Sequence, residues 1–307
     1  MRMVVSRTAG VLPAYGQDAR GLGDLDPRLN AYHDDLADER LRGRVTAARY
    51  VAGLPARVVA GQAPVRAKPM PQAETITFYH YGEEVRVFDA TDGYAWCQSL
   101  FDRYVGYVER SCIALGPTPA ATHYVAAAGC YAYEAPDLRS AVTGFLPRHS
   151  AVVVVETGLL TRGTEYTRLD NACHVPLGCL SEQPPRSPDI AAAAALYLGS
   201  PYLWGGRSFL GIDCSGLVQA AFRDIGITVL RDTDMQHDSI GKPVSIGDEA
   251  GLQQGDLIYL PGHVMIYAGE GEVIHADGAT MRVRRDNLAE LMRVRRLEFA
   301  GFAVRRP

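Results

Sequence analysis

One cysteine in the C-terminal third of the chain has the sequence context of a nucleophile. Cys214 follows Gly211-Ile212-Asp213 and opens a helix predicted over 214–225. A sulfur at a helix N-terminus lies near free backbone N–H groups and the positive end of the helix dipole, which favour the thiolate. The same N–H groups can serve an oxyanion hole. The pattern predicts a reactive thiol of lowered pKa; the alternative is a small buried side chain, the usual role of a free cysteine.

Two histidines could serve this thiol. His263 begins a strand predicted over 264–268, and His275 lies on the next strand, over 273–276. A three-residue loop at 269–271 would pair 268 with 272 and place both imidazoles on one face as diagonal neighbours, whereas a two-residue loop would place them on opposite faces. On one face, His263 would be the general base that keeps the thiol ionised, and His275 would fix its tautomer.

Zinc binding is a competing interpretation of the same three side chains, because Cys and His are zinc ligands. Zinc sites usually show short ligand spacing within at least one pair. Here the gaps between the three residues are 49 and 12 positions. The spacing therefore favours nucleophilic catalysis.

Composition limits what the rest of the chain can be. It has 307 residues, 47% of them hydrophobic, with 31 Gly and 18 Pro, which predicts two or three domains with many turns and short strands. The net charge is −4 and no Lys/Arg run resembles a phosphate-binding stripe, which argues against a nucleic-acid partner. No apolar run approaches 18 residues, so we expect no membrane-spanning helix.

The N-terminal sequence and the cysteines bear on the compartment. Arg7 interrupts any apolar stretch near the N-terminus, so we expect no signal peptide and a cytoplasmic protein. Its six cysteines should then be mostly reduced. Bridges between Cys97 and Cys112 or between Cys173 and Cys179 remain alternatives for an oxidising compartment.

The chain divides by its patterning into four parts. Residues 1–44 are interpreted as a linker or docking segment with one or two short helices. Alternating residues and tight turns predict small barrels over 45–117 and 118–186, the second ending in a proline-rich linker. Matching positions recur at offsets of 67 to 70 residues, which indicates an internal duplication. Residues 187–307 read as helices followed by strands, an α+β domain.

The first helix of this last domain is expected over 190–198. Ser187 is its predicted N-cap, and Gly199 its stop.

Four ordered blocks of the α+β domain resemble the NlpC-type (NlpC/p-sixty) cysteine peptidases. They begin at Asp213-Cys214-Ser215-Gly216-Leu217 and continue with the segments 255–259, 262–267 and 273–276; Pro201–Gly206 matches as well. The resemblance covers 187–307 and implies a papain-like fold. With two SH3-like barrels in front, it extends to a subgroup that cleaves γ-D-glutamyl-diamino acid bonds in cell-wall peptides.

The resemblance implies roles for individual residues. Cys214 would attack, with His263 as base and His275 as orienting residue. Substrate contacts would come from Tyr202, Asp213, Ser215, Thr233, Glu83 and Tyr104. Of these, Glu83 and Tyr104 of the first barrel would bind the free amine of an N-terminal L-Ala.

The implied activity is endopeptidase cleavage between γ-D-Glu and a diamino acid in peptides released from peptidoglycan, in recycling, with no metal or organic cofactor. Partners would be these peptides, without membrane insertion. Other activities stay open: an acyl or amide transferase of papain-like fold, a cell-wall-binding protein, or an effector delivered to other cells.

Overall fold

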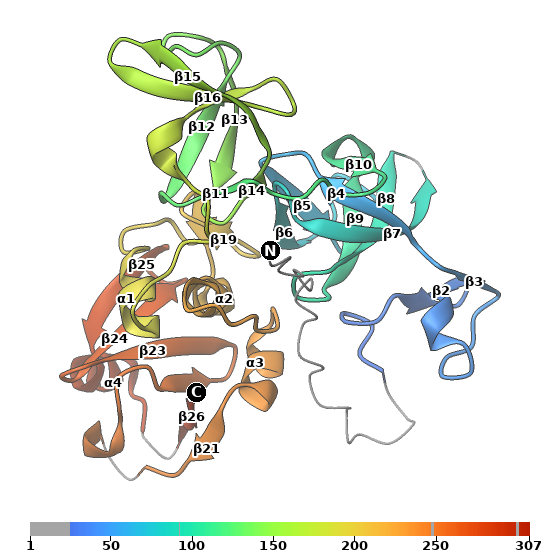
Figure 1. Cartoon of the computed structure of the whole chain (residues 1–307). Helices are drawn as coiled ribbons and strands as arrows, with labels where there is room; N and C mark the ends of the chain where they lie inside the picture. The colour runs from blue at the N-terminus through green and yellow to red at the C-terminus, as the bar shows by residue number, and fades with distance from the viewer. Residues whose placement is uncertain (1–24, 92, 247–248, 299–300) are drawn as a thin grey trace, which may run out of the picture.

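The computed structural model describes residues 25–91, 93–246, 249–298 and 301–307. The N-terminal positions on which the export-signal expectation rests lie outside these ranges. The described chain forms two β domains, a C-terminal domain with helices, and a small N-terminal lobe (Figure 1). In the described part of the chain, no helix is long and apolar enough to cross a membrane.

The N-terminal lobe, residues 25–51, is built from strands. It contains β1 (Tyr32–His33), β2 (Leu36–Asp38), the 3-10 turn η1 (Glu39–Leu41) and β3 (Arg49–Val51). Leu36 is fully buried and packs with Trp96 and Val105 of the neighbouring domain. Of the one or two short helices expected here, the described residues contain the 3-10 helix η1, while β1 and β2 form where the rest of the helical pattern was expected.

The first β domain is one strongly bent seven-stranded sheet in the order β10-β4-β7-β8-β9-β5-β6. Its elements are β4 (Leu54–Val58), β5 (Gln62–Arg66), β6 (Thr75–His80), β7 (Glu84–Thr91), β8 (Tyr94–Ser99), β9 (Val105–Glu109), η2 (Arg110–Cys112) and β10 (Ile113–Leu115).

The second β domain has equivalent strand neighbours but divides them between two sheets, of order β14-β11-β18 and β13-β12-β17-β16-β15. Its elements are β11 (His123–Val125), β12 (Gly129–Tyr133), β13 (Val142–Pro147), β14 (Ala151–Val152), β15 (Val154–Thr161), β16 (Thr164–Leu169), β17 (His174–Pro176), η3 (Leu177–Cys179) and β18 (Leu180–Ser181). For example, β5 begins at Gln62 and β12 at Gly129, an offset of 67 residues. Equivalent strands also pair alike, as in β5 with β6 and β12 with β13. The predicted duplication is therefore confirmed at the level of elements. All six cysteines are free thiols.

The C-terminal domain packs helices against an antiparallel six-stranded sheet of order β21-β26-β22-β23-β24-β25. Its strands are β19 (Arg207–Ser208), β20 (Gly211–Ile212), β21 (Lys242–Val244), β22 (Leu257–Leu260), β23 (His263–Gly269), β24 (Glu272–Asp277), β25 (Arg282–Asn287) and β26 (Ala303–Arg306). Its helices are α1 (Ile190–Ala195), α2 (Cys214–Asp224), α3 (Thr233–Ser239) and α4 (Leu288–Arg295), with the turn η4 (Glu249–Gly251).

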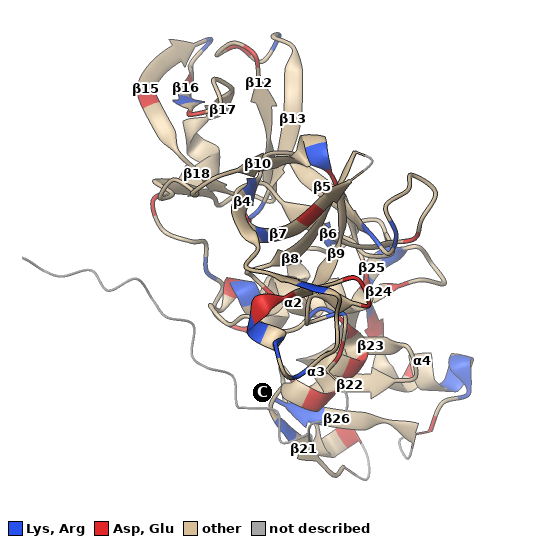
Figure 2. Ribbon diagram, turned by 90° about the vertical axis from the view of Figure 1, so that its right-hand side faces the viewer, with Lys and Arg blue, Asp and Glu red and all other residues tan. Residues whose placement is uncertain are grey.

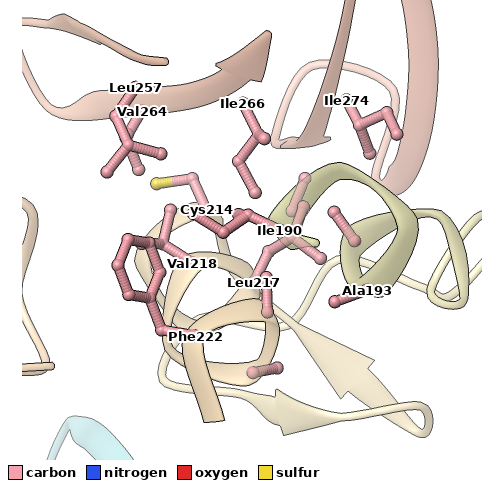
Figure 3. Close-up of a cluster of buried hydrophobic side chains, with 14 of the residues drawn as sticks. Ile190, Ala193, Cys214, Leu217, Val218, Phe222, Leu257, Val264, Ile266 and Ile274 are labelled. Carbon is pink, nitrogen blue, oxygen red and sulfur yellow. The ribbon is translucent and has the colours of Figure 1, made fainter. Parts of the chain in front are cut away.

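The core of this domain lies between α1, α2 and the strands β22 to β24. Leu217, Ile266 and Ile274 are almost completely buried there (Figure 3). Helix α2 begins and ends within one residue of its predicted bounds, and Gly226 follows it with a φ of 86°. Helix α1 is shorter than predicted, and its N-cap is Asp189, which accepts from the Ala192 N–H at 2.8 Å.

Ser187 is not that cap. Its hydroxyl instead donates to Asp224 on α2, at 2.6 Å.

The hairpin between β23 and β24 decides where the two histidines point. Ile266 pairs with Ile274 and Tyr267 with Val273, the register that the sequence predicted. The loop, however, has two residues, Glu270 and Gly271, both with positive φ, and the register shifts by one between Tyr267 and Gly269. This bulge supplies the extra residue that a two-residue loop lacks, so both imidazoles still share a face.

Candidate active site

Asp213 positions the thiol of Cys214 by capping α2. One carboxylate oxygen accepts from the Gly216 N–H at 2.7 Å, and the other accepts from the Gly205 N–H at 2.8 Å. The second oxygen also accepts from the buried guanidinium of Arg231 at 2.6 Å. Helix α2 therefore starts at the nucleophile because Asp213 satisfies one of its free N–H groups and connects it to Gly205 and Arg231.

The sulfur itself lies under β23 and beside the start of α3. Cys214 is 6% exposed, and its Sγ is 3.9 Å from the Thr233 hydroxyl. Burial raises the pKa of the thiol, and the Asp213 carboxylate adds to this, against smaller opposing effects from Val264 and Thr233. The lowered thiol pKa expected from the helix N-terminus is therefore wrong for the free protein, because loss of hydration outweighs the helix end.

The two histidines form a hydrogen-bonded chain with a carboxylate. His263 Nε2 lies 2.9 Å from His275 Nδ1, and His275 Nε2 lies 3.0 Å from an oxygen of Asp286 on β25. Burial lowers the pKa of His263 to about 4 and also lowers that of His275, so both rings are neutral at neutral pH.

The carboxylate of Asp286 sets the tautomers of both rings. An ionised carboxylate only accepts, so His275 carries its proton on Nε2 and accepts at Nδ1. His263 must then donate from Nε2, which leaves the lone pair of its Nδ1 free to take a proton. The chain Asp286–His275–His263 thus prepares a neutral base on the strand that covers Cys214.

Asp286 was not among the sequence-predicted site residues. Asp286 on β25 pairs with Val273 on β24. His275 is two positions after Val273, so Asp286 and His275 lie on the same face of the sheet. The strand register would have identified it, had the turn between these strands been predicted.

A cavity of about 640 Å³ opens in front of the nucleophile. Five of the predicted site residues line it: Tyr104, Asp213, Cys214, Ser215 and Thr233. Its walls come from the first β domain and the C-terminal domain, with Arg28 added from the N-terminal lobe. The Tyr104 hydroxyl donates to Asp232 at 2.8 Å, and Arg28 bonds both Asp232 and Asp234.

Four of the predicted site residues, all in the described part of the chain, do not line this cavity. His263 and His275 are on β23 and β24, and His263 directly precedes Val264, whose backbone interacts with the Cys214 thiol. Tyr202 is half-buried and packs against the core cluster that contains Cys214; burial raises its pKa to about 12. Glu83 is buried elsewhere, in ion pairs with Arg207 and Arg223, so the structure does not bring it to the nucleophile.

Another acidic residue of the first β domain does reach the cavity. Glu74 is exposed, lines the cavity, and accepts from the indole N–H of Trp204 at 3.0 Å. The sequence offered no periodic signal for it, because it lies between a turn and the start of β6. Elsewhere, the described residues contain no group of three or more Cys, His, Asp or Glu side chains arranged to hold a metal ion.

Comparison with known proteins agrees with these two kinds of domain. Residues 199–298 match the NlpC/P60 family, and residues 65–113 match the bacterial dipeptidyl-peptidase SH3 domain. Residues 199–298 are therefore a domain of the NlpC/P60 family of cysteine peptidases, and residues 65–113 belong to an SH3-like β domain.

Among curated proteins, the chain is similar to dipeptidyl-peptidase 6 of Lysinibacillus sphaericus, with 36% identity over 33% of this chain and 36% of that protein. It is also similar to the gamma-D-glutamyl-L-lysine dipeptidyl-peptidase of Bacillus subtilis, with 34% identity over 37% of this chain and 38% of that protein. The matches span little more than a third of these relatives.

A solved structure extends the likeness in fold. An NlpC/P60 family protein from Bacillus cereus superposes with a TM-score of 0.65 over 82% of this chain and 99% of that one, at 19% identity. At this identity the likeness concerns the fold alone.

We expect alkylation of Cys214 by iodoacetamide to show the pH dependence of a buried thiol. Because burial raises its pKa, the rate should keep rising with pH beyond about 8.5, the pKa of an ordinary thiol. The rate is measured by mass spectrometry of the Cys214 peptide, with exposed glutathione as control. A rate that is already constant between pH 6 and 8 would show that a thiolate forms in the free protein.

Asp213→Asn should destabilise the chain by about 3–5 kcal/mol, because it removes one charge of a buried ion pair and leaves Arg231 unpaired. The loss is measured as a shift of the urea midpoint. Asp234→Asn is the matched control, since that carboxylate is 63% exposed and its loss should change stability by less than about 1 kcal/mol. Equal effects at both positions would contradict the role given to the Asp213–Arg231 pair.

Proposed function

We propose that the chain is a cysteine peptidase that hydrolyses the bond between γ-D-Glu and a diamino acid in peptides derived from peptidoglycan. One observation carries the proposal. A thiol at the head of α2 faces a cavity, and the strand above it carries a neutral histidine whose tautomer is set by His275 and Asp286. This is the arrangement that acyl transfer to sulfur requires.

The reaction proceeds in two halves. His263 Nδ1 takes the Cys214 proton as the sulfur attacks the carbonyl carbon, and the resulting imidazolium protonates the leaving amine. The acyl group is then held as a thioester. Water attacks this thioester, giving its proton to His263, and the carboxylate product leaves with regeneration of the thiol.

The charges of the cavity support a substrate with a free ammonium group. Four carboxylates line it, from Glu74, Asp213, Asp232 and Asp234, against two guanidinium groups, from Arg28 and Arg231. The described lining thus has an excess of two negative charges. A carboxylate with a cationic amine makes a charge-assisted hydrogen bond, and exposed Glu74 is the best placed to do so.

The same charges favour released peptides over the intact wall. A stem peptide joined to its sugar through the N-terminus has no free N-terminal ammonium group, whereas a released peptide has one. Two relatives are named dipeptidyl-peptidase and gamma-D-glutamyl-L-lysine dipeptidyl-peptidase. These names agree with a substrate that has only two residues before the cleaved bond, the second being a γ-linked Glu. The proposal therefore includes peptide recycling, with L-Ala as the N-terminal residue.

The test uses L-Ala-γ-D-Glu-L-Lys and its N-acetylated form, with products followed by chromatography. The chain should release L-Ala-D-Glu from the free peptide, and acetylation should lower kcat/KM by about 10–100-fold through loss of charge-assisted bonds. Glu74→Gln should reduce the ratio of kcat/KM between the free and the acetylated peptide. The matched control Glu84→Gln, at an exposed glutamate of the same domain that does not line the cavity, should leave this ratio unchanged.

Cys214→Ala should bind the free peptide without turnover. Equal cleavage of both peptides would refute the amine recognition but not the peptidase. If neither lysyl peptide nor its diaminopimelate counterpart is cleaved while Cys214 alkylates normally, the peptidase proposal fails.

Asp286→Ala should lower kcat by about 10–100-fold with little change in KM, because His275 loses the acceptor that sets its tautomer. Asp286→Asn should be milder, since the amide oxygen still accepts from Nε2. Initial rates at saturating peptide measure both variants, with the far-ultraviolet spectrum as a control for folding. An unchanged kcat in the alanine variant would show that Asp286 does not contribute to the reaction.

A further inference from the structure

The place where the three domains meet contains an unusual set of buried charged side chains. Glu83 of the first β domain accepts from Arg207 at 3.1 Å and from Arg223 at 2.8 Å, both from the C-terminal domain. Asp224, next to Arg223, accepts from Arg148 at 2.9 Å and lies 2.6 Å from the His149 imidazole, both in the second β domain. Figure 2 shows acidic and basic segments together near α2.

The charges at this junction do not balance. One carboxylate, Glu83, is shared by two guanidinium groups, and burial lowers the pKa of Arg223 despite that partner. Arg186 of the interdomain linker adds a further positive charge; it donates to the Arg223 carbonyl at 3.1 Å. Among the described residues of the junction, four arginines thus face three carboxylates: Glu83, Asp224 and the buried Asp102, which accepts from Gln219 at 3.0 Å. The excess is one positive charge, and Arg186, which carries one of the four, is exposed.

The histidines do not alter this count. Burial lowers the pKa of His149 to about 4 and that of His80 to about 3, so both are neutral at neutral pH. Within the described part of the chain, neither ring nitrogen of His80 has a hydrogen-bond partner, although the side chain is only 2% exposed. Buried polar groups are usually satisfied, so within the described part of the chain the small recess around His80 lacks a polar partner.

A cavity of about 200 Å³ opens onto this excess of charge. Arg186 and Arg223 line it together with His149 and the rings of Phe101 and Tyr124. The Arg223 guanidinium also stacks on Phe101, 4.4 Å from the ring centre, which holds it in place. A recess of about 10 Å³, lined by His80 and Arg207, lies behind and is too small for a polyatomic ion.

We propose that this cavity binds a small oxyanion, with a phosphate or carboxylate group held by Arg186 and Arg223. No carboxylate is among the described residues that line this cavity, so an anion there would pair with two guanidinium groups without a competing charge in the lining. The guanidinium fork matches the oxygens of either group. The cavity shares no lining residue with the Cys214 cavity, so the inference does not depend on the proposed peptidase.

An anion in this cavity would touch all three domains. Phe101 comes from the first β domain, Tyr124 and His149 from the second, and Arg223 from the C-terminal domain. Its binding should therefore raise the temperature at which the assembled chain unfolds, because a ligand of the folded state stabilises it.

The test measures binding of inorganic phosphate to the full chain by calorimetry, with the unfolding temperature followed in parallel. Sodium chloride keeps the ionic strength constant. Acetate in place of phosphate distinguishes the two anion classes. We expect saturable binding of at least one of them, with a shift of the His149 imidazole resonances.

Two substitutions should act in opposite directions. Arg186→Gln removes an exposed cation and should raise the dissociation constant roughly tenfold, the effect of one charge-assisted bond. Glu83→Gln removes the carboxylate that competes with the anion for Arg223, so this substitution should lower the dissociation constant. Arg44→Gln, an exposed arginine of the N-terminal lobe, is the matched control and should change nothing.

Absence of saturable binding of both anions, or equal binding by the wild type and Arg186→Gln, would overturn the proposal. If Glu83→Gln does not fold, Arg186→Gln still decides. Cys214→Ala should bind phosphate as the wild type does, and loss of binding in that variant would place the anion in the other cavity and so overturn the proposal.

Discussion

The buried ion pair between Asp213 and Arg231 is the interaction on which the position of the nucleophile depends. Asp213 caps α2 and also holds the Gly205 backbone, so the helix carrying Cys214 cannot shift independently of the loop before it. Arg231 extends the connection in two directions, to the Ser215 hydroxyl at 2.7 Å and to the Thr77 hydroxyl of the first β domain at 3.0 Å. One pair thus fixes the thiol relative to two domains.

The cavity in front of the thiol is consequently a property of the whole chain. Tyr104 and Arg28 reach Asp232 from different lobes, and Asp232 precedes Thr233, whose hydroxyl faces the sulfur. The segment that begins α3 is therefore held from outside its own domain. A small, acidic cavity forms because three parts of the sequence close around one helix end.

Sequence patterns predicted well those structural features that depend on residues close to one another in the chain. The start of α2 at Cys214 follows from the Asp-Cys-Ser-Gly turn. The shared face of His263 and His275 was predicted as well, although it results from strand alternation together with a bulge that the sequence did not indicate. Glu83 shows where such patterns fail: its partners Arg207 and Arg223 are more than 120 positions away, and nothing in the sequence around it signals their approach. Burial is equally invisible to sequence, which is why the direction of the Cys214 pKa was wrong.

The bulge beside the β23–β24 loop has a consequence for how this region can vary. The side of the sheet on which His275 emerges depends on whether the number of residues between it and Ile266, bulge included, is odd or even. Insertions of two residues would leave the imidazole where it is, whereas a single insertion or deletion would turn it to the opposite face. Related chains should therefore change the length of this hairpin in even steps, or gain and lose the bulge together with a loop residue.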